Sequence, residues 1–152
     1  METAEPRSCK ILTVEDNPGD VLLTRVALDD LGLFVSLSVV GAGDEAVDFL
    51  FRRGNHANAP IPDLVLLDLN LPRKDGWAVL DEVKADIRLR HIPIVVLTSS
   101  AARPDLLRAW EAHANAVMTK PADYEAYFLM LQKTFDFWLK TVSGAEPPGR
   151  AS

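Results

Sequence analysis

Hydrophobic residues recur along the chain in two alternating patterns. Short apolar runs rich in Val, Ile and Leu are separated by stretches whose apolar residues have helical spacing. Because continuous apolar runs joined by helices are typical of buried parallel strands, we expect a doubly wound α/β fold, with a five-stranded parallel sheet between two helical layers. The expected strands are 10–15, 34–40, 63–68, 93–98 and 115–119, and the expected helices are 18–31, 43–52, 76–88, 104–113 and 123–141.

Four of the apolar runs lead into residues that phosphoryl chemistry can use. Glu15 and Asp16 come at the end of the first run, Asp68 ends the third, Thr98 ends the fourth and Lys120 follows the last. In open parallel sheets, ligand sites gather beyond the carboxyl ends of the strands. We therefore expect these five side chains to converge on one edge of the sheet.

Three carboxylates at one edge repel each other unless a cation neutralises them. Mg²⁺ prefers oxygen ligands and joins carboxylates to phosphate groups. We expect Asp16 and Asp68 to be direct ligands, Glu15 to act through water and the Asn70 carbonyl to complete the set. Each acid also has an ordinary explanation, because acidic residues are common in turns and at helix N-termini.

Asp68 is the candidate nucleophile, because a carboxylate that attacks phosphorus forms an acyl phosphate. Lys120 offers a compact cation that can pair with Asp68 or hold a phosphoryl oxygen, and the Thr98 hydroxyl can donate to another oxygen. Singly, a lysine after a strand is commonly a solvated end charge, and Thr is a common strand residue. The joint arrangement is more specific than any of its parts.

Together these residues form a signature that resembles the receiver domain of two-component response regulators. The resemblance covers residues 10–141. It rests on four motifs, which are Val14-Glu15-Asp16-Asn17, the run from Leu66 to Pro72 followed by Asp75-Gly76, Val96-Leu97-Thr98-Ser99, and Thr119-Lys120-Pro121.

The resemblance implies a (βα)5 fold and a phosphorylated aspartate. It implies that a histidine kinase phosphorylates Asp68 and that Thr98 and Lys120 contact the phosphoryl group. It also implies a cis peptide bond between Lys120 and Pro121. The Mg²⁺ ligands that it implies are Glu15, Asp16, Asp68 and the Asn70 carbonyl.

Further features resemble the small regulators that are paired with phytochrome-type histidine kinases. They are the run 15–20, the long loop 52–62 and the sequence Phe-Trp-Leu at 137–139. The resemblance implies a phytochrome-like kinase as partner. One departure concerns Val117, since many receivers carry an aromatic residue three positions before the lysine, which puts an aromatic switch in doubt here.

Composition limits the remaining possibilities. With 152 residues and 48% hydrophobic content, the chain accommodates one domain at 10–141, with an N-terminal extension at 1–9 and a disordered tail at 142–152. A net charge of −6 argues against nucleic-acid binding. Neither a signal peptide nor a membrane span is expected, and the lone cysteine, Cys9, indicates a cytoplasmic protein.

We expect no output domain, so the signal should pass to a downstream protein or to a phosphotransfer domain. The last helix offers a surface for a homodimer, because Met130 and Phe137 extend beyond its expected core face. That core face comprises Tyr124, Phe128, Leu131, Phe135 and Trp138.

Three other interpretations remain open. A pseudo-receiver would signal by binding alone. A haloacid-dehalogenase-like phosphatase also uses an aspartate and Mg²⁺, but it needs a second acid two residues later, where this chain has Asn70. The sequence at 41–46 fits the nucleotide-binding pattern G-x-G-x-x-A, which arises easily by chance.

The three histidines are expected at the surface, at no metal-ligand spacing, and are His56, His91 and His113.

Overall fold

The computed structural model describes residues 8–32, 34–99 and 103–142. Its centre is a five-stranded parallel sheet of order β2-β1-β3-β4-β5, which confirms the predicted fold class. The strands are β1 (Cys9–Val14), β2 (Val35–Val40), β3 (Leu64–Asp68), β4 (Ile94–Thr98) and β5 (Ala116–Thr119). The helices are α1 (Pro18–Leu31), α2 (Gly43–Phe51), α3 (Gly76–Ala85), α4 (Arg103–Glu111) and α5 (Tyr124–Val142).

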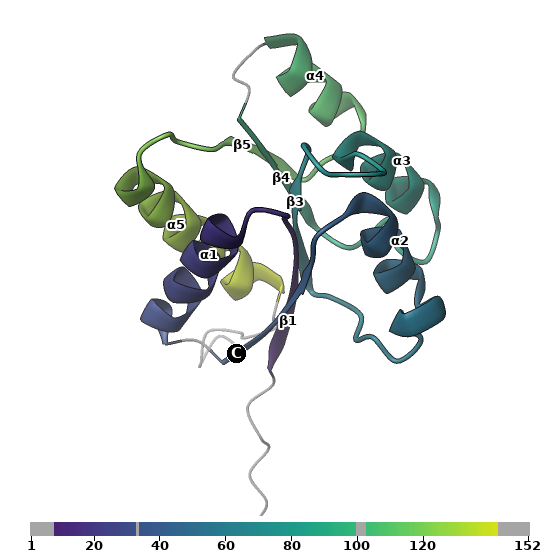
Figure 1. Cartoon of the computed structure of the whole chain (residues 1–152), viewed down its shortest axis with the longest axis horizontal. Coiled ribbons are helices and arrows are strands. Elements are labelled where there is room, and N and C mark those ends of the chain that lie inside the picture. The colour runs from purple at the N-terminus through teal and green to yellow at the C-terminus, as the bar shows by residue number, and fades with distance from the viewer. Residues whose placement is uncertain (1–7, 33, 100–102, 143–152) are drawn as a thin grey trace, which may run out of the picture.

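The helices form two layers, with α1 and α5 on one face of the sheet and α2, α3 and α4 on the other (Figure 1). Successive side chains of a strand point to opposite faces, so a central strand that is covered on both faces is apolar at most of its positions. In β3, Val65 and Leu67 join the core beneath α2 and α3, while Leu64 and Leu66 join the core beneath α1 and α5. This two-sided burial explains why the strands are continuous apolar runs.

All ten predicted elements are present, with small differences at their ends. The largest difference is at α3, which ends at Ala85 rather than at residue 88. Asp86 leaves the helical conformation, and its side chain accepts a hydrogen bond of 2.8 Å from the Arg88 N–H, which forms a tight turn. A short 3-10 turn, Gly54–His56, lies within the predicted loop. The predicted tail at 142–152 lies outside the described residues, except for Val142.

Side-chain caps fix the starts of two helices beside the carboxyl edge of the sheet. The Asn17 side chain accepts a hydrogen bond of 3.0 Å from the Asp20 N–H, and Pro18 begins α1. The Asp75 side chain accepts a hydrogen bond of 3.0 Å from the Ala78 N–H at the start of α3, as its sequence position predicts. Both caps hold the loops that follow β1 and β3.

The core face of α5 agrees with the predicted face at Leu131 and Phe135 but differs from it at both ends of the helix. Tyr124 is 63% exposed, so its prediction as a core residue is wrong. The buried series is Tyr127, Leu131, Phe135 and Leu139, whose spacing of four keeps it against the sheet. Phe128 and Trp138 are half-buried beside that series. Met130 is half-buried too, whereas Phe137 is 61% exposed.

No helix in the described part of the chain combines the length and apolar character needed to cross a membrane.

Two glycines allow loops to pack closely at the carboxyl edge. A Cβ atom at Gly43 would overlap the carbonyl oxygen of Lys74, and one at Gly76 would lie 2.6 Å from the carbonyl oxygen of Asp68. Backbone atoms cannot move aside as easily as the end of a flexible side chain. Gly43 therefore belongs to the contact between α2 and the β3–α3 loop, which explains the second glycine of the pattern at 41–46.

We expect Gly43→Ala to destabilise the protein by about 1–3 kcal/mol, because the new methyl group must displace backbone. Gly41→Ala is the matched control, since its Cβ atom would meet nothing closer than 3.9 Å, and it should change the free energy of unfolding by less than about 0.5 kcal/mol. Urea denaturation of both variants measures the difference. Equal stabilities would contradict the packing role of Gly43.

Candidate functional site

The sheet register brings the predicted site residues to one edge. Val14 of β1 pairs with Leu67 of β3, so Glu15 and Asp68 follow on neighbouring strands. On the other side of β3, Asp68 pairs with Leu97, and Thr98 comes next. Thr98 in turn pairs with Thr119, the residue before Lys120.

Lys120 stands at the centre of this edge and donates hydrogen bonds to three carboxylates. Its Nζ lies 2.8 Å from Glu15 Oε1, 2.9 Å from Asp68 Oδ2 and 3.0 Å from Asp20 Oδ2. The Lys120 side chain is only 12% exposed. Its backbone N–H donates to the Thr98 carbonyl oxygen at 2.8 Å, which ties the start of the β5–α5 loop to β4.

Glu15, Asp16 and Asp68 form a group that could hold a metal ion. One carboxylate oxygen from each residue lies within 4.8 Å of the others. Glu15 and Asp68 are both 4% exposed, while Asp16 is exposed and opens the group to solvent. Carboxylate oxygens are ligands for hard divalent cations such as Mg²⁺, so the donor chemistry fits the predicted metal. The Asn70 carbonyl as a further ligand stays a prediction.

The charge balance of the site shifts two pKa values. The pKa of Glu15 is raised to about 7, chiefly because the carboxyl group is buried. The hydrogen bond from Lys120 opposes this shift, and the charge of Asp68 adds to it. Burial alone would lower the pKa of Lys120, but the hydrogen bonds to Glu15 and Asp68 and the negative charge of Asp68 hold it above its usual value. Lys120 therefore stays charged, and Glu15 can take up a proton near neutral pH.

The carboxylate of Asp68 is held at both oxygens. The Asn70 N–H donates to Oδ1 at 2.9 Å, and Lys120 Nζ donates to Oδ2. Thr98, which is 4% exposed, ends the neighbouring strand. A fixed, largely buried carboxylate beside a cation is suited to attack an incoming electrophile.

Sequence reasoning missed two residues of this site, Asp20 and Tyr127. Asp20 lies in the first turn of α1, where an acidic residue is unremarkable in sequence. The Tyr127 ring lies with its centroid 5.9 Å from Lys120 Nζ, and its buried hydroxyl has no hydrogen-bond partner among the described residues. Both residues border a hollow of about 390 Å³ next to Lys120.

The predicted cis bond between Lys120 and Pro121 is wrong, because the described chain contains only trans peptide bonds. The trans isomer is the lower in energy at X-Pro bonds, and with it Lys120 still reaches all three carboxylates. His91 and His113 are exposed as predicted, but His56 is half-buried against the Phe49 ring, 5.3 Å between centroids.

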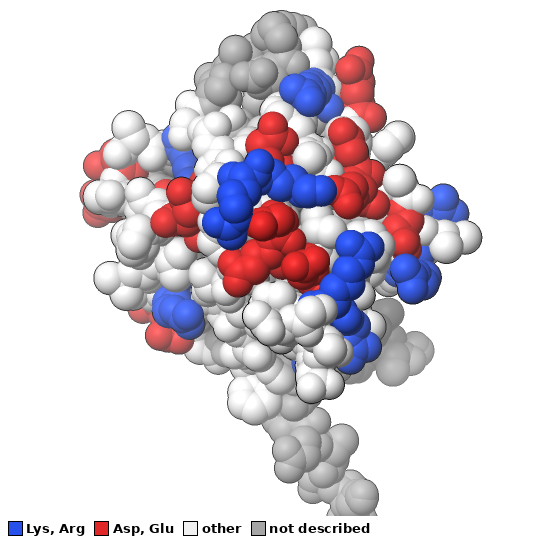
Figure 2. Space-filling model, turned by 45° about the vertical axis from the view of Figure 1, so that its right-hand side comes forward, with Lys and Arg blue, Asp and Glu red and all other residues white. Residues whose placement is uncertain are grey.

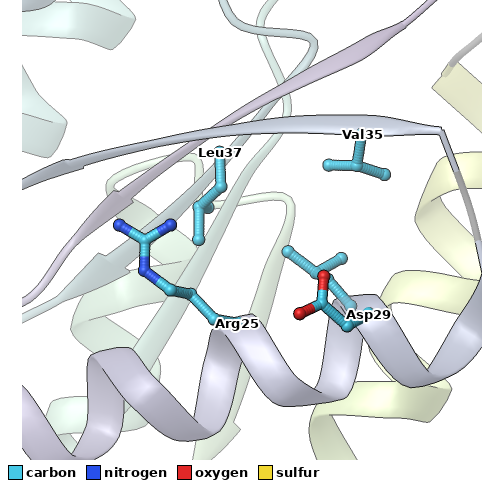
Figure 3. Close-up of a pocket in the computed structure, with 5 residues that line it drawn as sticks. Arg25, Asp29, Val35 and Leu37 are labelled. Carbon is cyan, nitrogen blue, oxygen red and sulfur yellow. The ribbon is translucent and has the colours of Figure 1, made fainter.

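Further charged groups and a second hollow occur elsewhere among the described residues. Figure 2 shows acidic and basic side chains gathered together near the middle of the face that it presents. An exposed ion pair joins Arg73 of the β3–α3 loop to Asp44 of α2, with 2.9 Å between Arg73 Nε and Asp44 Oδ2. A hollow of about 150 Å³ lies between α1 and β2, bordered by Arg25 and Asp29 of α1 and by Val35 and Leu37 of β2 (Figure 3).

Comparison with known proteins agrees with this geometry. Residues 11–132 match the family described as response regulator receiver domain. The response regulator Rcp1 of Synechocystis sp. is 41% identical over 133 residues, which are 88% of this chain and 90% of Rcp1. The probable methanogenesis regulatory protein FilR2 of Methanothrix harundinacea is 38% identical, over 85% of this chain and 83% of FilR2.

Solved structures give the same result. The phosphorylated cyanobacterial phytochrome response regulator RcpA has a TM-score of 0.86 at 40% identity, over 94% of this chain and 100% of RcpA. The Mn²⁺-bound form of Rcp1 has a TM-score of 0.85 at 40% identity, over 88% of this chain and 96% of that one. The chain therefore belongs to the response regulator receiver domains of two-component signalling, and phytochrome response regulators are among its relatives.

Proposed function

We propose that this receiver accepts a phosphoryl group from a histidine kinase onto Asp68. The observation that carries the proposal is the Asp68 carboxylate, which is 4% exposed and held by Lys120 and the Asn70 N–H. Oxygens of Glu15 and Asp16 lie beside it. A related regulator, RcpA, is known in a phosphorylated form, which supports the same chemistry here.

In the proposed reaction, an Asp68 oxygen attacks the phosphorus atom of a phosphohistidine. The new P–O bond forms as the P–N bond breaks, and the imidazole nitrogen keeps the electron pair of the broken bond. Lys120 stabilises negative charge on the phosphoryl oxygens, and the Thr98 hydroxyl donates to one of them. Mg²⁺, held by Glu15, Asp16, Asp68 and the Asn70 carbonyl, would supply the charge that lets an anionic donor approach.

A phytochrome-type histidine kinase is the proposed donor. Its support comes from the relatives, because RcpA is a phytochrome response regulator and the related AtBRR, 44% identical with a TM-score of 0.69, is a bacteriophytochrome response regulator. The downstream partner would be a protein that recognises the phosphorylated receiver, or a phosphotransfer domain that takes the group onward.

A haloacid-dehalogenase-like phosphatase needs a second acid two positions after the nucleophile. Here that position is Asn70, an amide.

Asp68→Asn should abolish phosphorylation, because an amide cannot act as the nucleophile. Intact-mass spectrometry after incubation with acetyl phosphate and Mg²⁺ should show a gain of one phosphoryl group on the wild type and none on the variant. EDTA should abolish the gain on the wild type. A wild type that binds Mg²⁺ but gains no phosphoryl group would contradict the proposal and favour a pseudo-receiver that signals by binding alone.

Mg²⁺ affinity should depend on pH because of Glu15. Its pKa, raised to about 7, means that protons compete with the metal below neutral pH. We expect Mg²⁺ affinity to rise about tenfold between pH 6 and pH 8 and then to level off. Calorimetric titration measures this change, and Glu15→Gln is the control, with weaker binding that varies little over the same range. A flat wild-type profile would rule out Glu15 as the titrating group.

We also propose a homodimer that involves the C-terminal helix. On α5, Leu129 is 50% exposed and Phe137 is 61% exposed, with the Phe137 ring edge-on to Trp138. On α4, Leu107 and Trp110 are 50% and 54% exposed. Large apolar side chains in such numbers are typical of a surface that a partner covers, and a second copy of the chain is the commonest partner.

Phe137→Glu should shift the protein from dimer to monomer, because a carboxylate in an apolar interface loses its hydration. Phe34→Glu is the matched control, since Phe34 is equally exposed at 61% but precedes β2 and belongs to neither α4 nor α5. Sedimentation velocity over a concentration series measures the equilibrium. A wild type that stays monomeric at every concentration would disprove the dimer.

A further inference from the structure

The ammonium group of Lys120 has no N–H group left to donate to a further acceptor. A lysine side chain has three donors, and all three are engaged by carboxylates of Glu15, Asp20 and Asp68. The partners come from different elements, since Glu15 follows β1, Asp20 lies in α1 and Asp68 ends β3. A phosphoryl oxygen can therefore bind Lys120 only if one carboxylate releases it.

The three carboxylates differ in what phosphorylation does to them. Asp68 becomes an acyl phosphate and loses its negative charge, so it becomes the weakest acceptor. Glu15 belongs to the group of acids that could hold a metal ion, whereas Asp20 lies outside that group. Asp20 is thus the partner of Lys120 whose carboxylate neither reacts nor belongs to the candidate metal site.

The backbone around Asp20 is well fixed. The Asp20 N–H donates to the capping Asn17 side chain at 3.0 Å, and its carbonyl oxygen accepts from the Thr24 hydroxyl at 2.9 Å. The Asp20 side chain is 13% exposed. A rigid first helical turn therefore presents the carboxylate to Lys120.

Packing alone does not confine the end of Lys120. The hollow of about 390 Å³ next to the site is lined by Asp20 and Lys120 themselves and by Ser99, Tyr124 and Tyr127. The centroid of the Tyr127 ring lies 5.9 Å from Lys120 Nζ, and the hollow borders the Lys120 residue. Hydrogen bonds to carboxylates, rather than steric contacts, must then hold the ammonium group at Asp68.

We propose that Asp20 is a positioning residue that keeps the Lys120 ammonium group aimed at Asp68 before and after phosphoryl transfer. The inference rests on the proposed phosphorylation of Asp68. As the P–O bond forms, the leaving group of the phosphodonor departs with the electron pair of its broken bond to phosphorus. The Lys120 N–H that Asp68 releases then turns to a phosphoryl oxygen. Asp20 and Glu15 keep the other two N–H groups, and no proton is transferred.

An alternative role for Asp20 is purely electrostatic and predicts the opposite sign. A fourth carboxylate near the site repels an anionic phosphodonor, so removing its charge would speed phosphorylation. If Asp20 positions Lys120, its loss slows the reaction even though it removes a repelling charge. The direction of the rate change therefore separates the two roles.

The experiment measures the rate of Asp68 labelling by acetyl phosphate and Mg²⁺ across donor concentrations. Asp20→Ala should lower the rate at saturating donor by about tenfold, with little change in the half-saturating concentration. Asp20→Asn keeps an oxygen acceptor and should stay within about threefold of the wild type. Asp44→Ala is the matched control, because it removes the same charge from the first turn of another helix, where Asp44 pairs with Arg73.

A double-mutant cycle tests whether Asp20 acts through Lys120. In a Lys120→Ala background, Asp20→Ala should cause no further loss of rate, and urea denaturation confirms that each variant folds. The positioning role is overturned if Asp20→Ala equals or exceeds the wild-type rate, or if it slows both backgrounds equally. A wild type that is never labelled overturns the proposed function, and this role with it, whereas a labelled wild type with an unaffected Asp20→Ala overturns this role alone.

Discussion

Repulsion among carboxylates at one edge of the sheet is the constraint on which the site depends. Glu15, Asp16, Asp20 and Asp68 share this edge, and within the site the ammonium group of Lys120 is the cation that contacts three of them. Burial is the main cause of the raised pKa of Glu15, and the neighbouring charge of Asp68 raises that pKa further. The site is thus arranged around a deficit of positive charge, which a divalent cation would reduce.

The surrounding chain holds these charges in place by packing and capping. The strands that carry them are apolar on both faces, so each strand end has a fixed position and direction. Side chains of Asn17 and Asp75 cap the helices that follow, Gly76 lets the start of α3 approach the Asp68 carbonyl, and Gly43 lets α2 approach the Lys74 carbonyl. Like charges stay close together because the backbone around them cannot relax.

The structure also bears on how a phosphorylated state would be recognised. Val117 stands on β5 where many receivers carry an aromatic side chain, and it is half-buried against the core beneath α2, α3 and α4. A valine side chain is small and stiff at χ1, so its rotamer changes far less surface than rotation of a large ring would. Recognition would then depend on backbone and loop changes near Thr98 and Lys120, and on the exposed apolar residues of α4 and α5.

The order of strands and helices, the parallel sheet and the edge on which the site lies all followed from the sequence. They did so because apolar runs and helical spacing report burial directly, and because parallel strands place their carboxyl ends together. The same reasoning placed Glu15, Asp16, Asp68, Thr98 and Lys120 at this edge from the sequence alone. The ends of elements did not follow from these patterns. Helix α3 ends at Ala85, next to Asp86, whose side chain accepts a hydrogen bond from the Arg88 N–H.

The tertiary structure decided the features that depend on how side chains are oriented rather than on the order of residues in the chain. The core face of α5 includes Tyr127 and leaves out Tyr124, contrary to the expectation from hydrophobicity, because the packing of the helix on the sheet decides which side chains face inward. Asp20 had no signal in sequence, since an acid in the first turn of a helix is ordinary until the fold brings a lysine 100 residues away within 3.0 Å of it. Sequence determined which strand-end groups reach the edge, and three-dimensional packing determined which side chains touch, because contact requires two side chains to meet in both direction and distance.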